Sequence, residues 1–188
     1  MKKFLILSLV LSISVSCFSQ VWTADYNHSK LGFIVTHLAI SDVSGHFDKY
    51  NVTVTSSKPD FSDAVFELSV ETNSINTRIA NRDKHLRSAD FFDVEKFPTM
   101  TFKSTGIKSI GENKYELTGN LTMLGITKPV TMTLKFRGTF VKGDKTTAGL
   151  QITGTIKRSD FNLGSTFPKL VISDEVEIKA DGEFRQSK

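Results

Sequence analysis

Apolar and polar residues alternate with a period of two through most of the chain after residue 30, and no other feature restricts the fold as strongly. This period is typical of β-strands that have one buried and one solvated face. In segment 115–123 the odd positions are apolar or glycine, whereas the even positions are polar. Segment 130–140 repeats the pattern and predicts that Phe140 shares the inward face of Val130. Because Gly125 supplies a turn residue between the two runs, they are predicted to form an antiparallel hairpin.

Further alternating segments bring the total to about eight short strands, which is typical of an all-β barrel or sandwich. They lie near residues 31–35, 47–54, 64–70, 100–104, 148–156 and 176–184. The segment Arg78–Ser88 lacks alternation and predicts a short helix with Asn76 or Thr77 as its N-cap. One short helix cannot cover a whole sheet, so the sheet must fold on itself as a barrel or a sandwich. We predict an all-β domain, with an antiparallel barrel as the favoured architecture.

The interior of this barrel is predicted to be apolar, but the residues leave open whether it is hollow. The chain has 15 phenylalanines against one tryptophan and three tyrosines, and phenylalanine has no polar tip. Small residues on the inward faces leave room for a ligand, or simply match large residues opposite them as the barrel tapers. These small inward residues are Ala148, Ala180, Gly119, Gly154 and Gly182.

The first residues have the pattern of an export signal. Lys2 and Lys3 precede an apolar stretch that is too short to span a bilayer, and small residues follow it. We predict a signal peptide at residues 1–19 and one mature domain at residues 20–188, in a periplasmic or secreted protein. The alternative is a lipoprotein anchored through Cys17, although Ser14 stands where such signals usually carry a larger aliphatic residue.

Composition and motifs favour few kinds of chemistry. Without Lys2 and Lys3 the net charge falls from +4 to +2, which does not favour nucleic acid. Cys17 is the only cysteine, so a mature chain starting at residue 20 has no thiol for catalysis or for binding metal. The spacing of His28, His37, His46 and His85 is not that of a metal site, and no phosphate loop or nucleophile elbow occurs. We predict no metal, no cofactor and no catalytic residues.

The predicted helix is basic and adjoins an apolar loop. Arg78, Arg82 and Arg87 lie just before Phe91 and Phe92. If the helix covers one end of the barrel, these arginines are candidate contacts for the anionic head of an amphiphile. The alternative is an ordinary solvated helix face.

Four blocks of residues then occur in order between Thr23 and Phe184. They are Asp25 with His28-Ser29, Phe33, His37-Leu38, Gly45 and Phe47; Arg82-Asp83, His85-Leu86 and Ser88 with Asp90-Phe91-Phe92-Asp93 and Phe97-Pro98; Gly119, Leu121-Thr122 and Gly125-Ile126-Thr127-Lys128; and Arg158, Asp160-Phe161 with Asp174-Glu175-Val176. Together these blocks resemble the YceI family of bacterial periplasmic proteins. One departure is Asn162, where the family commonly has glycine.

The resemblance implies an eight-stranded antiparallel, lipocalin-like barrel with a short helix at its mouth, often as a homodimer. It also implies a long apolar tunnel for a polyisoprenoid, such as a quinone or polyprenyl compound, or for a fatty amide, without enzymatic activity. It implies that Arg82, Asp83, His85 and Asp90 fix the helix and loop to the barrel by hydrogen bonds rather than all contacting a ligand.

The leading hypothesis is a non-catalytic carrier or sequestering protein of the cell envelope for one long isoprenoid or acyl chain. Its predicted lining comprises Phe33, Val35, Phe47, Phe66, Leu68, Phe91, Phe92, Phe102, Leu121, Met123, Leu134, Phe136, Ile152 and Ile156. Two alternatives stay open. One is an enzyme that acts on a lipid-like substrate through His28, His37 or His85, and the other is a filled barrel with a structural or interaction role.

Overall fold

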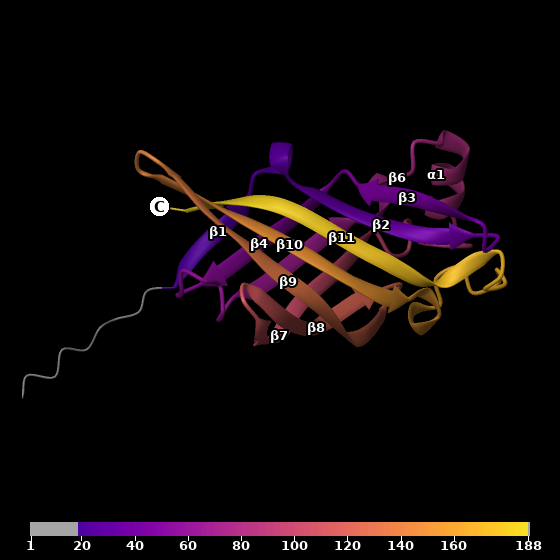
Figure 1. Cartoon of the computed structure of the whole chain (residues 1–188). Coiled ribbons are helices and arrows are strands. Elements are labelled where there is room, and N and C mark those ends of the chain that lie inside the picture. The colour runs from indigo at the N-terminus through magenta and orange to yellow at the C-terminus, as the bar shows by residue number, and fades with distance from the viewer. Residues whose placement is uncertain (1–18, 188) are drawn as a thin grey trace, which may run out of the picture.

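A computed structural model describes residues 19–187, which form a mostly-β domain with one short α-helix (Figure 1). The predicted signal peptide, apart from its last position, and Cys17 lie outside the described residues. The strands are β1 Gln20–Ala24, β2 Lys30–His37, β3 Ser41–Phe47, β4 Tyr50–Ser56, β5 Val65–Glu71, β6 Ile75–Asn76, β7 Thr99–Gly111, β8 Lys114–Met123, β9 Ile126–Lys142, β10 Lys145–Lys157 and β11 Ile172–Gln186. The helix α1 spans Ala80–Arg87, and short 3-10 turns are η1 Tyr26–His28, η2 Thr72–Ser74 and η3 Arg158–Phe161.

Eight of these strands form a closed antiparallel ring, which confirms the predicted barrel. Their order around the ring is β1-β4-β5-β7-β8-β9-β10-β11, and β11 pairs with β1 to close it. The β8–β9 hairpin turns through Leu124 and Gly125, both with positive φ, at the position predicted for a tight connection. Closure leaves no free edge within the ring itself.

Strand β11 has two partners along its length, and this divides the barrel into two ends. Its residues 172–181 pair with β2, whereas residues 184–186 pair with β1. Strand β2 then pairs with β3, and β3 pairs with the short β6. Figure 1 shows α1, the β2–β3 turn and the start of β11 at one end, and the C-terminus at the other. The wall at the α1 end therefore contains β2, β3 and β6 in place of β1.

The register of the β9–β10 hairpin corrects one predicted side-chain direction. Leu150 pairs with Phe136, but Gly149 pairs with Gly138, so Arg137 is an extra residue in β9. Such a bulge reverses which side chains point inward beyond it. Phe140 accordingly faces outward and is 68% exposed, which shows that the inward prediction for this residue was wrong.

The start of α1 also differs from the sequence prediction. Its N-cap is Ile79, and neither Asn76 nor Thr77 caps it. Arg78 has a positive φ of 65°, so the chain turns sharply there and the helix begins only at Ala80. The Thr77 hydroxyl instead donates to the buried Asp83 carboxylate at 2.5 Å.

Buried side chains form two clusters, one at each end of the barrel. The first cluster contains Trp22 and Phe61, and it fills the end near the C-terminus. Phe61 is fully buried, and its ring centre lies 5.0 Å from that of Trp22 and 5.2 Å from that of Phe136. The second cluster lies at the α1 end. Phe102 and Ile152 pack against both clusters and join them.

Most of the small inward residues that the structure places against large side chains leave room for those side chains rather than for a cavity. Gly119 and Gly154 have no room for a Cβ atom, because the side chains of Phe102 and Met132 lie against them. Of the five predicted positions, Ala180 and Gly182 border a cavity of about 70 Å³, which is small. The taper interpretation therefore holds at Gly119 and Gly154.

The contact at Gly119 gives a prediction for stability. Gly119→Ala would press a Cβ against the Phe102 ring and to 2.7 Å from the Lys103 carbonyl oxygen, which belongs to the backbone and cannot rotate away. We expect a loss of about 1–3 kcal/mol in the free energy of unfolding, measured by urea denaturation.

Gly106→Ala on the same hairpin is the matched control. Its Cβ would meet only the Thr118 hydroxyl, which can rotate, so the loss should be smaller. Equal losses for the two variants would contradict the tight packing at Gly119.

Candidate functional site

A cavity of about 360 Å³ lies within the second buried cluster, at the α1 end of the barrel. Its lining is mostly aliphatic and aromatic, and it falls within the volume range of pockets that take small molecules. One wall of the cavity is formed by the inner faces of the neighbouring strands β10, β11 and β2. Its residues are Phe33 and Val35 from β2, Ile156 from β10, and Val176 and Ile178 from β11. We call this cavity the outer pocket.

Two loop segments cover the outer pocket. One carries Phe91 and Phe92 after α1, and the other is the cover segment, residues 162–171, between η3 and β11. The rings of Phe91 and Phe167 stack with centres 4.8 Å apart, and the His85 ring meets both edge-on. Aromatic contacts between α1, its following loop and the cover segment therefore form part of the cover of the pocket.

Arg158 ties the cover segment to the barrel. This side chain is only 4% exposed, and every hydrogen bond the structure gives its guanidinium goes to a backbone carbonyl. The acceptors are Leu163, Gly164, Phe167, Ile172 and Ser173, at 2.6–3.1 Å. Asn162, in the left-handed conformation with φ 58°, starts the segment, and Asn tolerates this conformation better than most residues. Glycine, which the family commonly has at this position, also adopts this conformation readily.

The three arginines predicted as head-group contacts are placed differently. Arg82 lines the outer pocket, and its Nε and Nη2 atoms donate to the Thr77 hydroxyl and carbonyl at 2.8 and 2.9 Å. Arg87 donates to the carbonyls of Asn73 and Ile75, and it does not line the pocket. Arg78 is exposed and also lies outside the pocket lining. Only Arg82 of the three borders the apolar cavity.

Hydrogen bonds tie α1 to the residues just before and after it, and Arg87 ties it to Ile75 of β6. The Asp83 carboxylate accepts from the Thr77 amide at 2.8 Å, and the His85 Nε2 atom lies 2.9 Å from the Asp90 carboxylate. Together with Arg82, these groups fix the helix and the loop that cover the pocket.

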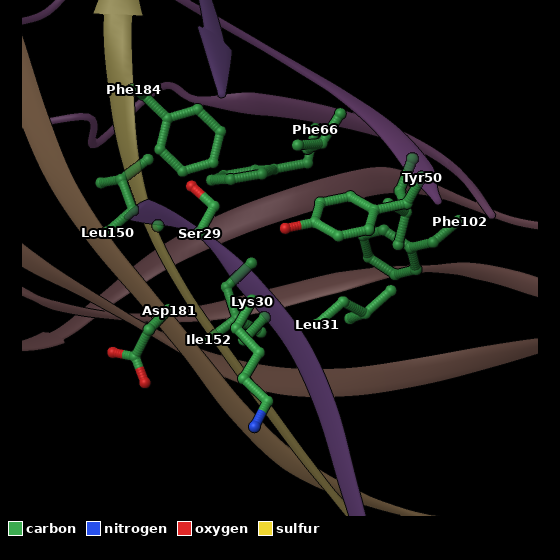
Figure 2. Close-up of a pocket in the computed structure, with 14 residues that line it drawn as sticks. Ser29, Lys30, Leu31, Tyr50, Phe66, Phe102, Leu150, Ile152, Asp181 and Phe184 are labelled. Atoms are coloured by element: carbon green, nitrogen blue, oxygen red, sulfur yellow. The ribbon is translucent and has the colours of Figure 1, made fainter. Parts of the chain in front are cut away.

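A second cavity, of about 70 Å³, is shown in Figure 2, and β2, β10 and β11 line it as they line the outer pocket. Its lining is almost wholly apolar and includes Phe66, Leu68, Phe102 and Ile152. Tyr50 on β4 also lines it, as Figure 2 shows. We call this cavity the inner pocket.

The predicted lining residues divide among the two pockets and the packed core. Eleven of the fourteen border one pocket or the other, from the strand faces that alternation identified or from the loop after α1, and three border neither pocket. In the outer pocket lie Phe33, Val35, Phe47, Phe91, Phe92, Met123 and Ile156, and in the inner pocket lie Phe66, Leu68, Phe102 and Ile152. Leu121, Leu134 and Phe136 border neither pocket and pack in the clusters.

Sequence reasoning missed the cover segment. Leu163, Phe167 and Val171 line the outer pocket, and Arg158 anchors them. Segment 162–171 has no alternation that would assign a direction to its side chains. The sequence feature that could have drawn attention to this segment is Arg158, just before it. In the structure this arginine is buried, and a buried arginine needs acceptors for its donors. Arg158 belongs to the fourth block of residues that resembles the YceI family, but the sequence alone assigned it no role.

The histidines are spread over different parts of the fold. His37 and His85 line the outer pocket, whereas His46 pairs with Asp48. His28 lies outside both pockets, with its Nδ1 atom 2.9 Å from the buried Asp25 carboxylate. This hydrogen bond lowers the pKa of Asp25 and raises the pKa of His28. Asp25 also accepts from Arg185, so the group of Asp25, His28 and Glu183 is an ion-pair network on the barrel wall.

The fold and the pockets define a class of protein, a lipocalin-like closed barrel with an apolar interior cavity. Comparison with known proteins gives the family. The model of the YceI-like domain matches residues 22–184, and the chain belongs to this family. It is 39% identical over 165 residues to Protein YceI of Salmonella newport and of Salmonella paratyphi A, covering 86% of this chain and 83% of each relative.

Solved structures agree. The Campylobacter jejuni YCEI protein is 30% identical, with a TM-score of 0.75 over 81% of this chain and 90% of that one. Burkholderia cenocepacia BcnA is 26% identical, with a TM-score of 0.74 over 85% and 98%. A polyisoprenoid binding domain from Saccharophagus degradans has a TM-score of 0.66 over 89% and 98%, and its 19% identity shows a shared fold alone. Among the described residues, no helix has the length and apolar character needed to cross a membrane.

The role of Arg158 can be tested by Arg158→Met. The variant leaves several carbonyls without their donor, so we expect a loss of at least about 2 kcal/mol in the free energy of unfolding. Hydrogen exchange followed by mass spectrometry should accelerate in segment 162–171 and stay unchanged in the β7–β8 hairpin.

Arg137→Met is the control, because Arg137 is exposed and lies 3.6 Å from Asp181. It should change stability by less than about 1 kcal/mol. If both variants behave alike, Arg158 does not anchor the cover segment.

Proposed function

We propose that this protein is a non-catalytic carrier or sequestering protein that buries one long isoprenoid or acyl chain. The observation that carries the proposal is the apolar outer pocket of about 360 Å³, set inside a closed barrel and covered by two segments. Each buried CH₂ group contributes about 0.8 kcal/mol without directional contacts, so such a pocket favours a chain over a polar metabolite.

The family supports the same kind of ligand. A neighbour with the same fold is a polyisoprenoid binding domain, and the chain belongs to the YceI-like family. The predicted lining residues retain their proposed role where they border a pocket. Leu121, Leu134 and Phe136 would support the wall from behind, and Arg82 is the one of the three predicted arginines that borders the outer pocket.

The cell envelope is the proposed place of action, because the predicted export signal would deliver the mature domain there. Such a location would give the protein access to the membrane lipids that it would carry. We also propose that the mature domain works as the homodimer that the family resemblance implies. Size-exclusion chromatography with light scattering would test the dimer, and a mass matching one chain would overturn it.

The binding function can be tested on purified protein by organic extraction and native mass spectrometry. A chain that co-purifies, or one taken up from added prenyl quinone or polyprenol, is the expected result. Persistent emptiness with both probes would instead support a filled barrel. Recovery of a chemically altered probe would support the alternative enzyme, for which His37 and His85 border the outer pocket.

Filling the outer pocket should weaken binding. Val35→Phe places a larger side chain on the wall formed by β2, where Val35 lines the pocket. We expect affinity for the polyprenol to fall at least about tenfold, equivalent to 1.4 kcal/mol. Titration followed by native mass spectrometry gives the affinity.

Val65→Phe makes the same substitution on β5, where Val65 is 44% exposed and lines neither pocket. It should bind like the wild type. Unchanged binding by Val35→Phe would place the chain elsewhere.

A further inference from the structure

The inner pocket continues the outer pocket along the same strand faces. On β2, Leu31 lines the inner pocket and Phe33 lines the outer one, two residues further on. On β11, Ala180 lines the inner pocket and Ile178 lines the outer one. Because side chains two apart on a strand lie on one face about 7 Å apart, the two cavities follow one another along the barrel interior.

One polar atom in the inner pocket has no partner. Of the buried side-chain nitrogen and oxygen atoms in residues 19–187, the Tyr50 hydroxyl is the one without a hydrogen bond. Figure 2 shows it directed away from Phe102, toward the side of the pocket where Ser29 lies. The other buried polar side chains of this barrel are paired, which makes an unpaired phenol a feature that needs a reason.

The phenol is suited to donate a hydrogen bond. Burial raises the pKa of Tyr50 above its ordinary value, so the hydroxyl keeps its proton at neutral pH. Its ring is held edge-on to that of Tyr26, with centres 5.4 Å apart, which fixes the direction of the hydroxyl. A preorganised donor in a dry cavity favours an acceptor that arrives with an apolar molecule.

The charge around the pocket selects a neutral acceptor. Lys30 and Asp181 contribute to the lining, but Figure 2 shows the amine and the carboxylate directed away from the cavity. Asp181 accepts from Gln151 at 2.8 Å on the outside of the wall. An anionic group in the inner pocket would be buried without a counter-charge, which is costly.

We infer that the inner pocket is a polar subsite in which the Tyr50 hydroxyl hydrogen-bonds a neutral oxygen, a hydroxyl or carbonyl, of the bound chain. This inference rests on the proposed carrier function and adds an orientation to it. The oxygen-bearing end enters first and reaches the inner pocket, while the hydrocarbon remainder occupies the outer pocket. With room for only a few non-hydrogen atoms, the inner pocket of about 70 Å³ takes a small polar end.

The test compares three probes of equal chain length on the full protein: oleyl alcohol, oleate and the corresponding alkene. Native mass spectrometry gives their relative affinities. Wild-type protein should prefer the alcohol to the alkene by about 5–10-fold, the range of one net hydrogen bond, and Tyr50→Phe should abolish this preference. The same variant without ligand should unfold at a higher urea concentration, because it removes an unpaired buried hydroxyl.

Tyr26→Phe is the matched control. Tyr26 is 51% exposed, and its hydroxyl lies outside the pocket lining, near Asn51, so its removal should leave the alcohol preference intact. Equal binding of the alcohol and the alkene by the wild type would overturn the subsite, because water would then be the partner of the Tyr50 hydroxyl in the complex. A preference for the alcohol that survives in Tyr50→Phe would also overturn it. Failure to bind all three probes would overturn the carrier function as well.

Discussion

The two partners of β11 determine the shape of this barrel. A strand offers hydrogen bonds on two edges, and one edge of β11 is taken by β10 along most of its length. Its other edge passes from β2 to β1 between residues 181 and 184. The ring of eight therefore closes directly only near the C-terminus. At the α1 end the wall is built by β2, β3 and β6, and α1 with the cover segment completes it.

This asymmetry explains why one half of the interior is packed and the other is hollow. In the closed half, Phe61 enters from the β4–β5 loop and fills the space between Trp22 and Phe136. The Asp63 carboxylate secures that loop, since hydrogen bonds from Ser56 and Ser57 outweigh burial and lower the pKa of Asp63 to about 2. In the other half, the aromatic residues stand at the rim and in the cover, so they enclose space rather than fill it.

The fold could be predicted from the sequence to the extent that strands follow a simple period. The hairpin at Leu124 and Gly125 and the inward faces of β2 and β8 agree with alternation, because the β2–β3 and β8–β9 pairings have no bulge. In β11 the alternation holds from Val176 onward, beyond the irregularity between residues 172 and 176. Phe140 could not be placed, since the extra residue at Arg137 depends on pairing with β10 and leaves no trace in the pattern.

The site was less predictable for a related reason. Alternation states which face a residue occupies, but it does not say whether the facing space is filled. Leu134 points inward and is fully buried, yet it borders neither of the two pockets. The unpaired Tyr50 hydroxyl likewise depends on what other strands bring near it. From the sequence, Arg87 was a candidate ligand contact. In the structure its guanidinium donates to the carbonyls of Asn73 and Ile75, which only the folded backbone brings close to it.

Arg158 has a consequence for how such a barrel can diverge. It holds the cover segment through main-chain oxygens, which every amino acid possesses, and it makes no demand on the side chains that the segment turns toward the cavity. Leu163, Phe167 and Val171 can therefore be exchanged for others while the attachment survives. The attachment of this segment and the ligand selectivity of its side chains can therefore change independently, in evolution or by design.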